Sequence, residues 1–266
     1  MEKHTEYSTE NEMMRVRHAI TLDPDNQYYF SHNHSQYELI YFLSGDASHV
    51  VEDRKYKLKP GDLVIISPLR YHFIQHDGIA MYDRINILFD SELPGMEHIK
   101  RLAEKYDVIS IPKGSMTEAL FAKFDFYKSR LENDEFLQAS HVLLQELSFD
   151  LSLIDSISEN KYSIINPILS RATEYINRNL FTFSGVTEVA EKLFITESYL
   201  FRLFRQELKM TPKRYINDKR MLIAQKMLQT GQRATAVAEA CGFTSYATFY
   251  RAYVKFLGKP PSNRCK

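Results

Sequence analysis

The sequence predicts an α+β protein of two domains, in which a β-barrel with following helices precedes an all-α domain. Between residues 20 and 90, short apolar runs alternate with turn residues, which is typical of antiparallel strands in a sandwich or barrel. From about residue 95 onward, the apolar residues recur with helical spacing. The charges divide the chain in a similar way. Residues 167–266 hold 17 Lys and Arg against 7 Asp and Glu, whereas residues 1–166 hold 17 against 27.

The β-rich domain is expected over residues 19–94. Its clearest strand is YELIYFL (37–43), which ends at the turn Ser44-Gly45-Asp46. Four further runs bounded by turn residues are ASHVVE, YKL, LVIIS and YDRINILF (82–89). Residues 1–18 are polar and rich in Glu, Ser, Thr and Asn, so they are expected to form a flexible arm.

Residues 95–158 are predicted to be helical. Apolar residues lie on one stripe in segment 116–131 and again in segment 134–154, where the stripe comprises Leu137, Val142, Leu144, Leu147 and Leu151. These stripes offer more apolar surface than packing against one sheet requires. Burial between two subunits of a homodimer and ordinary packing within one chain are equally good explanations. A Ser/Asn/Lys-rich stretch at 159–167 is the expected linker, and residues 168–266 the second domain.

Bulk properties exclude several classes of protein. There is no apolar run long enough to span a bilayer, and the polar N-terminus does not resemble a signal peptide. Cys241 and Cys265 are too few for a disulfide framework, and Cys241 is expected to be a small core residue. We therefore expect a cytoplasmic protein. The basic excess in the last hundred residues indicates that this half, rather than the acidic half, binds a polyanion.

An internal repeat is the strongest signal in the basic half. Val189-Ala190 and Leu193-Phe194-Ile195 match Val237-Ala238 and Cys241-Gly242-Phe243 at a constant offset of 48 residues. Beyond the following turn the offset becomes 49, as in Arg202 and Arg251. Apolar residues at i, i+3, i+4 and i+7, with Ala at i+4, predict a short helix that a second helix can cross closely. This spacing is that of a helix-turn-helix.

The second helix of each copy divides its residues between two faces. Thr196 begins the helix in the first copy, and Thr244 or Ser245 begins it in the second, as N-caps. Apolar residues such as Leu200 and Phe249 would pack inward, and polar or aromatic ones would face a major groove. A long helix after Thr211-Pro212 and up to Gly231 joins the copies. Its 27 Å or so suits recognition helices about one turn of duplex apart, roughly 34 Å.

The repeat resembles the DNA-binding domain of the AraC/XylS family of transcription regulators over about residues 168–266. The residues that carry the resemblance are Val237, Ala238, Cys241, Gly242, Phe243, Phe249, Arg251, Tyr253, Lys255, Gly258 and Pro261. Two departures are Lys209, where the family has Gly, and Arg264-Cys265, where it has Tyr-Arg. The resemblance implies binding to double-stranded DNA, with RNA polymerase as a further partner.

The resemblance also implies the DNA-binding residues. Base contacts are implied at Ser198, Phe201 and Arg202 in the first unit and at Tyr246, Ala247, Tyr250 and Arg251 in the second. The neighbouring Arg205 and Lys255 lie on the same exposed side of the two helices. The basic residues of the long helix, Lys213, Arg214, Lys219 and Arg220, are expected to contact phosphates rather than bases. Solvated surface charges and partly buried aromatic residues are the alternative interpretation.

The acidic half carries a candidate ligand site. His32, His34 and Glu38, followed by Gly45, have the spacing of the first cupin motif, and His72 stands where the His of the second motif would lie. In one extended strand, residues 32, 34 and 38 would face the same side. Residues 25–90 thus resemble the cupin-like barrel that many members of the family carry as an effector domain, which implies a small-molecule effector, often a sugar.

Three His and one carboxylate are also a plausible set for Fe, Mn or Zn. The second motif is degenerate, which favours a small-molecule pocket without a metal or other cofactor over a metal site. Structural histidines are a further alternative. We therefore expect an effector-controlled regulator rather than an enzyme. The alternatives are a metal-dependent cupin enzyme with a nucleic-acid-binding module and an architectural DNA-bending protein without a sensor.

Overall fold

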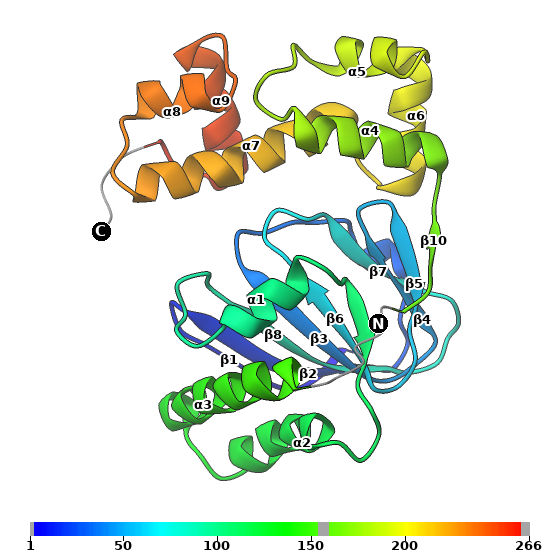
Figure 1. The fold of residues 1–266 in the computed structure, drawn as a ribbon, viewed down its shortest axis with the longest axis vertical. Helices are drawn as coiled ribbons and strands as arrows, with labels where there is room; N and C mark the ends of the chain where they lie inside the picture. Colours follow the sequence, from blue (N-terminus) through cyan, green and yellow to red (C-terminus); the bar gives the residue numbers. More distant parts are fainter. Residues whose placement is uncertain (1–2, 154–159, 262–266) are drawn as a thin grey trace. The chain divides into compact units, whose positions relative to one another are not determined.

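The computed structural model describes residues 3–153 and 160–261, and the chain divides into two compact units, residues 1–163 and 164–266 (Figure 1). The first unit combines antiparallel sheets with helices, and the second is helical. This confirms the predicted fold class. None of the described helices is both long and apolar enough to cross a membrane.

Two antiparallel sheets form the barrel of the first unit. The larger sheet has the described strands in the order β1 (Lys3–Glu10), β2 (Met14–Thr21), β8 (Tyr82–Phe89), β3 (Tyr37–Ser44), β6 (Asp62–Ile66) and β9 (Val108–Ser110). The smaller sheet has the order β10 (Tyr162–Ile164), β5 (Arg54–Lys57), β4 (Ala47–Val51) and β7 (His72–His76). A short 3₁₀ helix, η1 (Asn26–Tyr28), follows β2. The strands predicted between residues 37 and 89 are confirmed.

Both faces of the larger sheet are covered, and side chains alternate between them. On β8, Ile85, Ile87 and Phe89 join the core between the sheet and the helices. Tyr82, Arg84 and Asn86 have the opposite parity and line a pocket inside the barrel. One strand therefore supplies an apolar surface to the helices and a polar surface to the pocket.

Three helices pack on the outer face of the larger sheet: α1 (Glu97–Ala103), α2 (Met116–Lys128) and α3 (Asn133–Ser152) (Figure 1). Tyr41 of β3 stacks on Phe121 of α2, with 3.9 Å between ring centroids. His18 of β2 lies 2.9 Å from Asp125 of α2 and 2.8 Å from Asp83 of β8. Burial opposes the charged form of His18, but the hydrogen bonds to both carboxylates outweigh it and raise its pKa to about 9.

The predicted flexible arm at 1–18 is wrong. Within the described residues it forms β1 and most of β2, which pair with each other, and β2 also pairs with β8. Polar composition misled the prediction, because the inward face of β2 carries Arg15 and Arg17 instead of apolar residues. On the other face, Met14 and Val16 are buried against the helices. The barrel thus begins before residue 19.

Two other expectations for this unit need correction. The predicted linker 159–167 contains β10, which pairs with β5, and the second compact unit begins at residue 164 rather than 168. Val142 was placed on the apolar stripe of the second helix but lies 62% exposed. The other four residues of that stripe are buried, so most of the apolar excess is intramolecular core.

The second unit consists of helices α4 (Pro167–Arg178), α5 (Val186–Lys192), α6 (Glu197–Glu207), α7 (Pro212–Gln229), α8 (Ala234–Ala240) and α9 (Tyr246–Leu257). Helices α5 and α6 form the first helix-turn-helix and α8 and α9 the second, as the repeat predicts. Thr196 and Ser245 cap the second helix of each pair by accepting a backbone N–H hydrogen bond. The long helix α7 joins the two pairs (Figure 1).

Candidate ligand pocket and nucleic-acid interface

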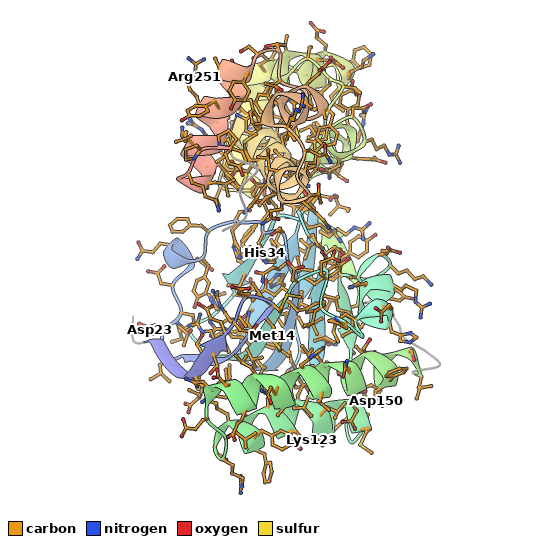
Figure 2. All side chains as sticks on the ribbon, turned by 90° about the vertical axis from the view of Figure 1, so that its left-hand side faces the viewer. Met14, Asp23, His34, Lys123, Asp150 and Arg251 are labelled. Atoms are coloured by element: carbon orange, nitrogen blue, oxygen red, sulfur yellow. The ribbon has the colours of Figure 1, made fainter. Side chains whose placement is uncertain are left out.

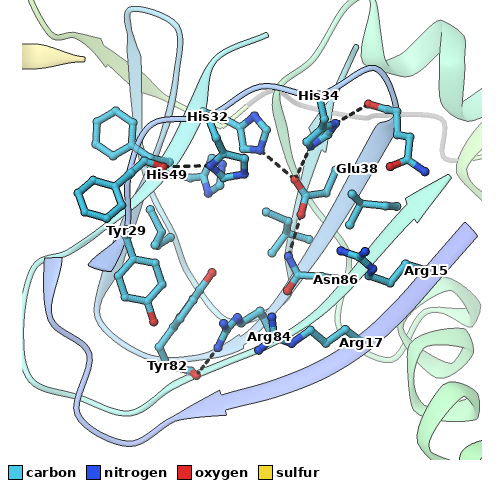
Figure 3. A pocket seen from close by; sticks show the side chains of 17 residues that line it. Arg15, Arg17, Tyr29, His32, His34, Glu38, His49, Tyr82, Arg84 and Asn86 are labelled. Carbon is cyan, nitrogen blue, oxygen red and sulfur yellow. Dashed lines mark hydrogen bonds and ion pairs between the residues drawn. The ribbon is translucent and has the colours of Figure 1, made fainter. Parts of the chain in front are cut away.

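A cavity of about 630 Å³ opens inside the barrel (Figure 3). Its volume falls within the ordinary range for small-molecule sites. All four sequence-predicted effector residues line it, together with side chains from β2, β3, β4, β7 and β8. The structure therefore brings His32, His34, Glu38 and His72 together, as the motif predicts.

The four residues form a tight cluster, although they do not share one strand. Glu38 lies on β3 and His72 begins β7, whereas His32 and His34 precede β3, with His32 in an isolated bridge to His72. The expectation of a common strand for residues 32, 34 and 38 is wrong. The loop nevertheless brings one ligand atom from each of the four residues within 4.8 Å of the others.

Glu38 is the centre of this cluster. Its Oε2 atom lies 3.2 Å from His34 Nε2 and 2.9 Å from His72 Nε2, and its Oε1 atom accepts a 2.9 Å hydrogen bond from Asn86. Burial favours the neutral acid, but the hydrogen bonds from the two histidines outweigh it and hold the pKa of Glu38 well below its ordinary value. Glu38 is therefore a buried carboxylate with a negative charge facing the pocket.

Backbone carbonyl groups fix the orientation of three histidine rings. The Nδ1 atoms of His32, His34 and His72 lie 3.0, 2.9 and 3.0 Å from the carbonyl oxygens of Phe30, Gln36 and Arg70, respectively. A carbonyl only accepts, so each Nδ1 carries a proton, and this orientation directs the Nε2 atoms of His34 and His72 at Glu38. The imidazole and carboxylate groups therefore form one polar cluster that faces the pocket.

The donor set also fits a divalent metal. Three imidazole nitrogens and one carboxylate oxygen suit Zn, Fe or Mn, and Nδ1 bonds to carbonyls are the usual support of histidine ligands. His32, His34, Glu38 and His72 would hold such an ion. The same distances also suit direct hydrogen bonds between carboxylate and imidazole, so the expectation of a metal-free pocket stays a prediction.

The other end of the pocket is rich in arginine, which the sequence analysis missed. Arg15 and Arg17 of β2 and Arg84 of β8 all line the cavity beside Asn86 (Figure 3). The available signal was the alternation in MRVRHAIT, where positions 15 and 17 share one face of a strand. His49, Tyr29 and Tyr82 also line the cavity, and burial with the nearby charge of His72 lowers the pKa of His49 to about 3.

The recognition helices present the residues that the sequence assigned to DNA. On α6, Ser198, Arg202 and Arg205 are exposed and Phe201 is partly exposed. On α9, Tyr246, Ala247, Tyr250, Arg251 and Lys255 are all exposed. Figure 2 shows Arg251 projecting outward from its helix. Lys213 and Arg214, at the start of α7, are exposed as well.

Two residues expected to contact phosphates are instead structural. Lys219 is 5% exposed and donates a 2.8 Å hydrogen bond to Asn177. Arg220 is 8% exposed and donates to the carbonyl oxygens of Leu180, Gly242 and Phe183 at 2.8, 3.2 and 3.4 Å. Sequence alone cannot separate these from exposed Lys213 and Arg214, because their burial depends on α4 and the α4–α5 loop packing against α7.

A barrel with an internal pocket, followed by two helix-turn-helix pairs, defines a DNA-binding transcriptional regulator with a ligand-binding domain. Comparison with known families agrees: residues 18–155 match an AraC-like ligand binding domain and residues 189–264 match a helix-turn-helix domain. The chain belongs to the AraC family of transcriptional regulators, which are not enzymes. The alternative of a metal-dependent enzyme is therefore wrong.

Relatives match along nearly the whole chain. The probable transcriptional regulator LumQ of Photobacterium leiognathi is 24% identical over 259 residues, covering 91% of this chain and 93% of that protein. The Msm operon regulatory protein of Streptococcus mutans is 22% identical over 267 residues, covering 97% and 95%. Among solved structures, the C-terminal domain of AraT from Geobacillus stearothermophilus is 29% identical, covers 37% of this chain and 84% of that chain, and has a TM-score of 0.35.

Proposed function

We propose that a small-molecule effector bound in the barrel pocket controls how this regulator binds its operator. The observation that carries the proposal is the cavity itself, which holds His32, His34, Glu38 and His72 at one end and three arginines at the other. Convergent polar side chains that line a cavity are what a specific small-molecule site requires.

Strand β3 can transmit a structural change from the pocket to the helices, because its side chains contact both. Glu38 and Ile40 face the cavity, whereas Leu39 and Tyr41 belong to the core beneath the helices, where Tyr41 stacks on Phe121. A ligand that moves Glu38 therefore shifts side chains packed against α2 on the opposite face. To control transcription, such a shift must change the relative populations of two conformations of the regulator that differ in DNA affinity.

For DNA recognition, we propose that α6 and α9 enter successive major grooves. Helix α7 has 18 residues and spans about 27 Å, close to one turn of duplex. Arg202 and Arg251 occupy equivalent positions of the two recognition helices, are exposed, and have the donor geometry that reads guanine. Ser198, Phe201, Tyr246, Ala247 and Tyr250 would complete base contacts, and Arg205, Lys213, Arg214 and Lys255 would contact phosphates.

The test of this proposal uses the full-length protein and an operator selected from random duplexes. Arg202→Ala and Arg251→Ala are each expected to weaken operator binding by about 1–3 kcal/mol and to relax the base preference at one position. Arg101→Ala removes the same charge from exposed helix α1 and serves as the control. Binding that is independent of salt, or unchanged in both recognition-helix variants, would contradict the proposal.

A homodimer is part of the proposal, and the outward face of α3 is its candidate interface. Val142, Phe149 and Leu153 are 62%, 60% and 74% exposed and recur at helical spacing on one side. Exposed apolar residues that cluster in this way are typical of contacts between proteins. Light scattering coupled to gel filtration should give a dimer that Phe149→Glu dissociates, whereas Lys59→Met, at an exposed position of the barrel, leaves it intact. A monomer at all concentrations would exclude this interface.

A further inference from the structure

The arginine end of the pocket is built to hold a negative charge. Arg84 is 6% exposed and its Nη1 atom donates to the carbonyl of Ala19, the hydroxyl of Thr21 and the carbonyl of Tyr82, at 2.9, 3.0 and 3.3 Å. All three acceptors are neutral. Among the described residues, no carboxylate lies within ion-pair distance of Arg84. The guanidinium charge is therefore buried without a protein counter-charge, which is costly.

A second guanidinium lies beside the first and adds to the positive potential. In the ladder between β2 and β8, Arg17 pairs with Asn86 and Ala19 pairs with Arg84, so Arg17 and Arg84 are diagonal neighbours on the pocket face. Burial lowers the pKa of Arg17, and the adjacent charge of Arg84 lowers it further. Two like charges on one face of the pocket repel each other, and an anion bound between them would offset this repulsion. Figure 3 shows both side chains directed into the same end of the cavity.

The opposite end of the pocket has the reverse character, because it accepts hydrogen bonds. The carboxylate oxygens of Glu38 face the cavity, and the rings of His32, His34 and His72 have their Nδ1 atoms directed at backbone carbonyls. This end therefore suits groups that donate, such as hydroxyls. Asn86 lies between the two ends and donates to Glu38.

From this polarity we propose that the effector is a small polyhydroxylated anion, such as a sugar acid or a sugar phosphate. Its anionic group binds Arg17 and Arg84, where planar guanidinium groups can hold a carboxylate or phosphate through paired hydrogen bonds. Its hydroxyl groups bind Glu38 and the histidine cluster. The apolar walls formed by Tyr29, Ile40 and Ile74 cover the carbon skeleton. The inference rests on the proposed role of the pocket as the effector site.

The test is a matched set of ligands on the full-length wild-type protein, followed by calorimetric titration. D-Glucose is the neutral member, D-glucuronate and D-gluconate carry a carboxylate, and D-glucose 6-phosphate carries a phosphate. At least one charged probe should raise the melting temperature and bind at least tenfold more tightly than D-glucose. The carboxylate and phosphate arms then identify which anionic group the arginines hold.

Variants assign the effect to the arginine end. Arg84→Met should weaken the preferred charged probe by about tenfold to a hundredfold, the loss expected for a hydrogen bond to a charged group. Arg84 also donates a hydrogen bond to the backbone of β2, so Arg84→Met could weaken binding by disturbing the fold. Arg17→Met is therefore a second test that does not remove this hydrogen bond. Lys59→Met removes an exposed barrel charge outside the pocket and should leave binding within twofold.

Two results would overturn the proposal. One is equal stabilisation by D-glucose and its charged derivatives, or stabilisation by D-glucose alone, which would leave the pocket as an effector site of another class. The other is the absence of stabilisation by every charged probe. Neither result affects operator binding through Arg202 and Arg251, so the proposed DNA recognition is judged separately by the DNA measurements.

Discussion

The two helix-turn-helix pairs have the same backbone conformation, but different residue types occupy the positions where that conformation is left-handed. Each pair requires a left-handed residue in its turn and another after its recognition helix. In the second pair both positions are glycine, Gly242 with φ 73° and Gly258 with φ 69°. In the first pair the equivalent residues are Phe194 with φ 56° and Lys209 with φ 57°. A side chain in this region costs about 1–2 kcal/mol, so the first pair carries strain that the second avoids.

The comparison also shows why glycine is needed more strictly at one of these positions. A Cβ atom at Gly242 would lie 2.6 Å from the carbonyl oxygen of Phe181, whereas a Cβ atom at Gly258 would meet nothing within 4 Å. The turn at Gly242 packs against the α4–α5 loop, and Arg220 joins the two by donating to both. Phe194, in contrast, is 93% exposed. Equivalent turns therefore differ in their surroundings more than in their backbone.

The largest effect is expected for Gly242→Ala. The change adds left-handed strain and forces the Phe181 carbonyl away from the turn, so it should destabilise the helical unit by about 3 kcal/mol. Urea denaturation of the full-length protein, followed by circular dichroism of the helices, measures the loss. Gly231→Ala, where φ is 85° but no atom lies within 4 Å of the added Cβ, isolates the strain alone. Equal losses in the two variants would show that the close approach is unimportant.

Removal of the Arg220 guanidinium, which joins the α4–α5 loop to the turn of the second pair, should have the next largest effect. Arg220→Met leaves the carbonyl oxygens of Leu180, Phe183 and Gly242 without their donor, and unsatisfied buried acceptors of this kind destabilise by about 2–3 kcal/mol in total. Arg178→Met removes an arginine whose side chain is 76% exposed and should cost less than about 0.5 kcal/mol. If both variants unfold at the same urea concentration, Arg220 is not a structural residue.

Much of this architecture could be predicted from the sequence, because local patterns determine it. The repeat at Val189-Ala190 and Val237-Ala238 predicts two helix pairs, and the spacing of His32, His34 and Glu38 predicts a cluster in the barrel. The burial of Cys241 was also expected; burial raises its pKa to about 11, so it is an unreactive core residue. Cys265 lies outside the described residues.

The incorrect predictions share a physical cause. The sequence around a charged residue does not indicate which groups that residue will contact in the folded protein. The polar composition of residues 1–18 made the first strand pair look like a flexible arm, although Arg17 faces a pocket that is partly built by β8, more than sixty residues further along the chain. Arg220 was grouped with Lys213 and Arg214 as a phosphate ligand, although distant carbonyls bury it. In each case tertiary packing determines whether the charged group contacts solvent, other protein groups or a ligand.

A smaller effect is expected for Gly258→Ala, which tests the left-handed requirement without a steric contribution. The residue caps α9 with its N–H bonded to the carbonyl of Val254, and open space surrounds its α-carbon. Strain alone should destabilise the helical unit by about 1 kcal/mol. The same denaturation experiment provides the value, with Gly242→Ala as the upper reference. A loss as large as that of Gly242→Ala would mean that the two glycines do not differ as the structure implies.

The smallest and most informative change restores glycine to the first pair. Lys209→Gly relieves about 1 kcal/mol of left-handed strain, and the extra freedom of glycine in the unfolded chain offsets roughly half of this gain. The net result should be stabilisation by about 0.5 kcal/mol. Lys255→Gly, in the interior of α9, should instead destabilise by about 1 kcal/mol, because glycine there has no strain to relieve. Opposite signs for two Lys→Gly changes in one domain would establish that backbone conformation, rather than side-chain contacts, distinguishes the two pairs. A loss at Lys209 equal to that at Lys255 would show that the first pair is not strained.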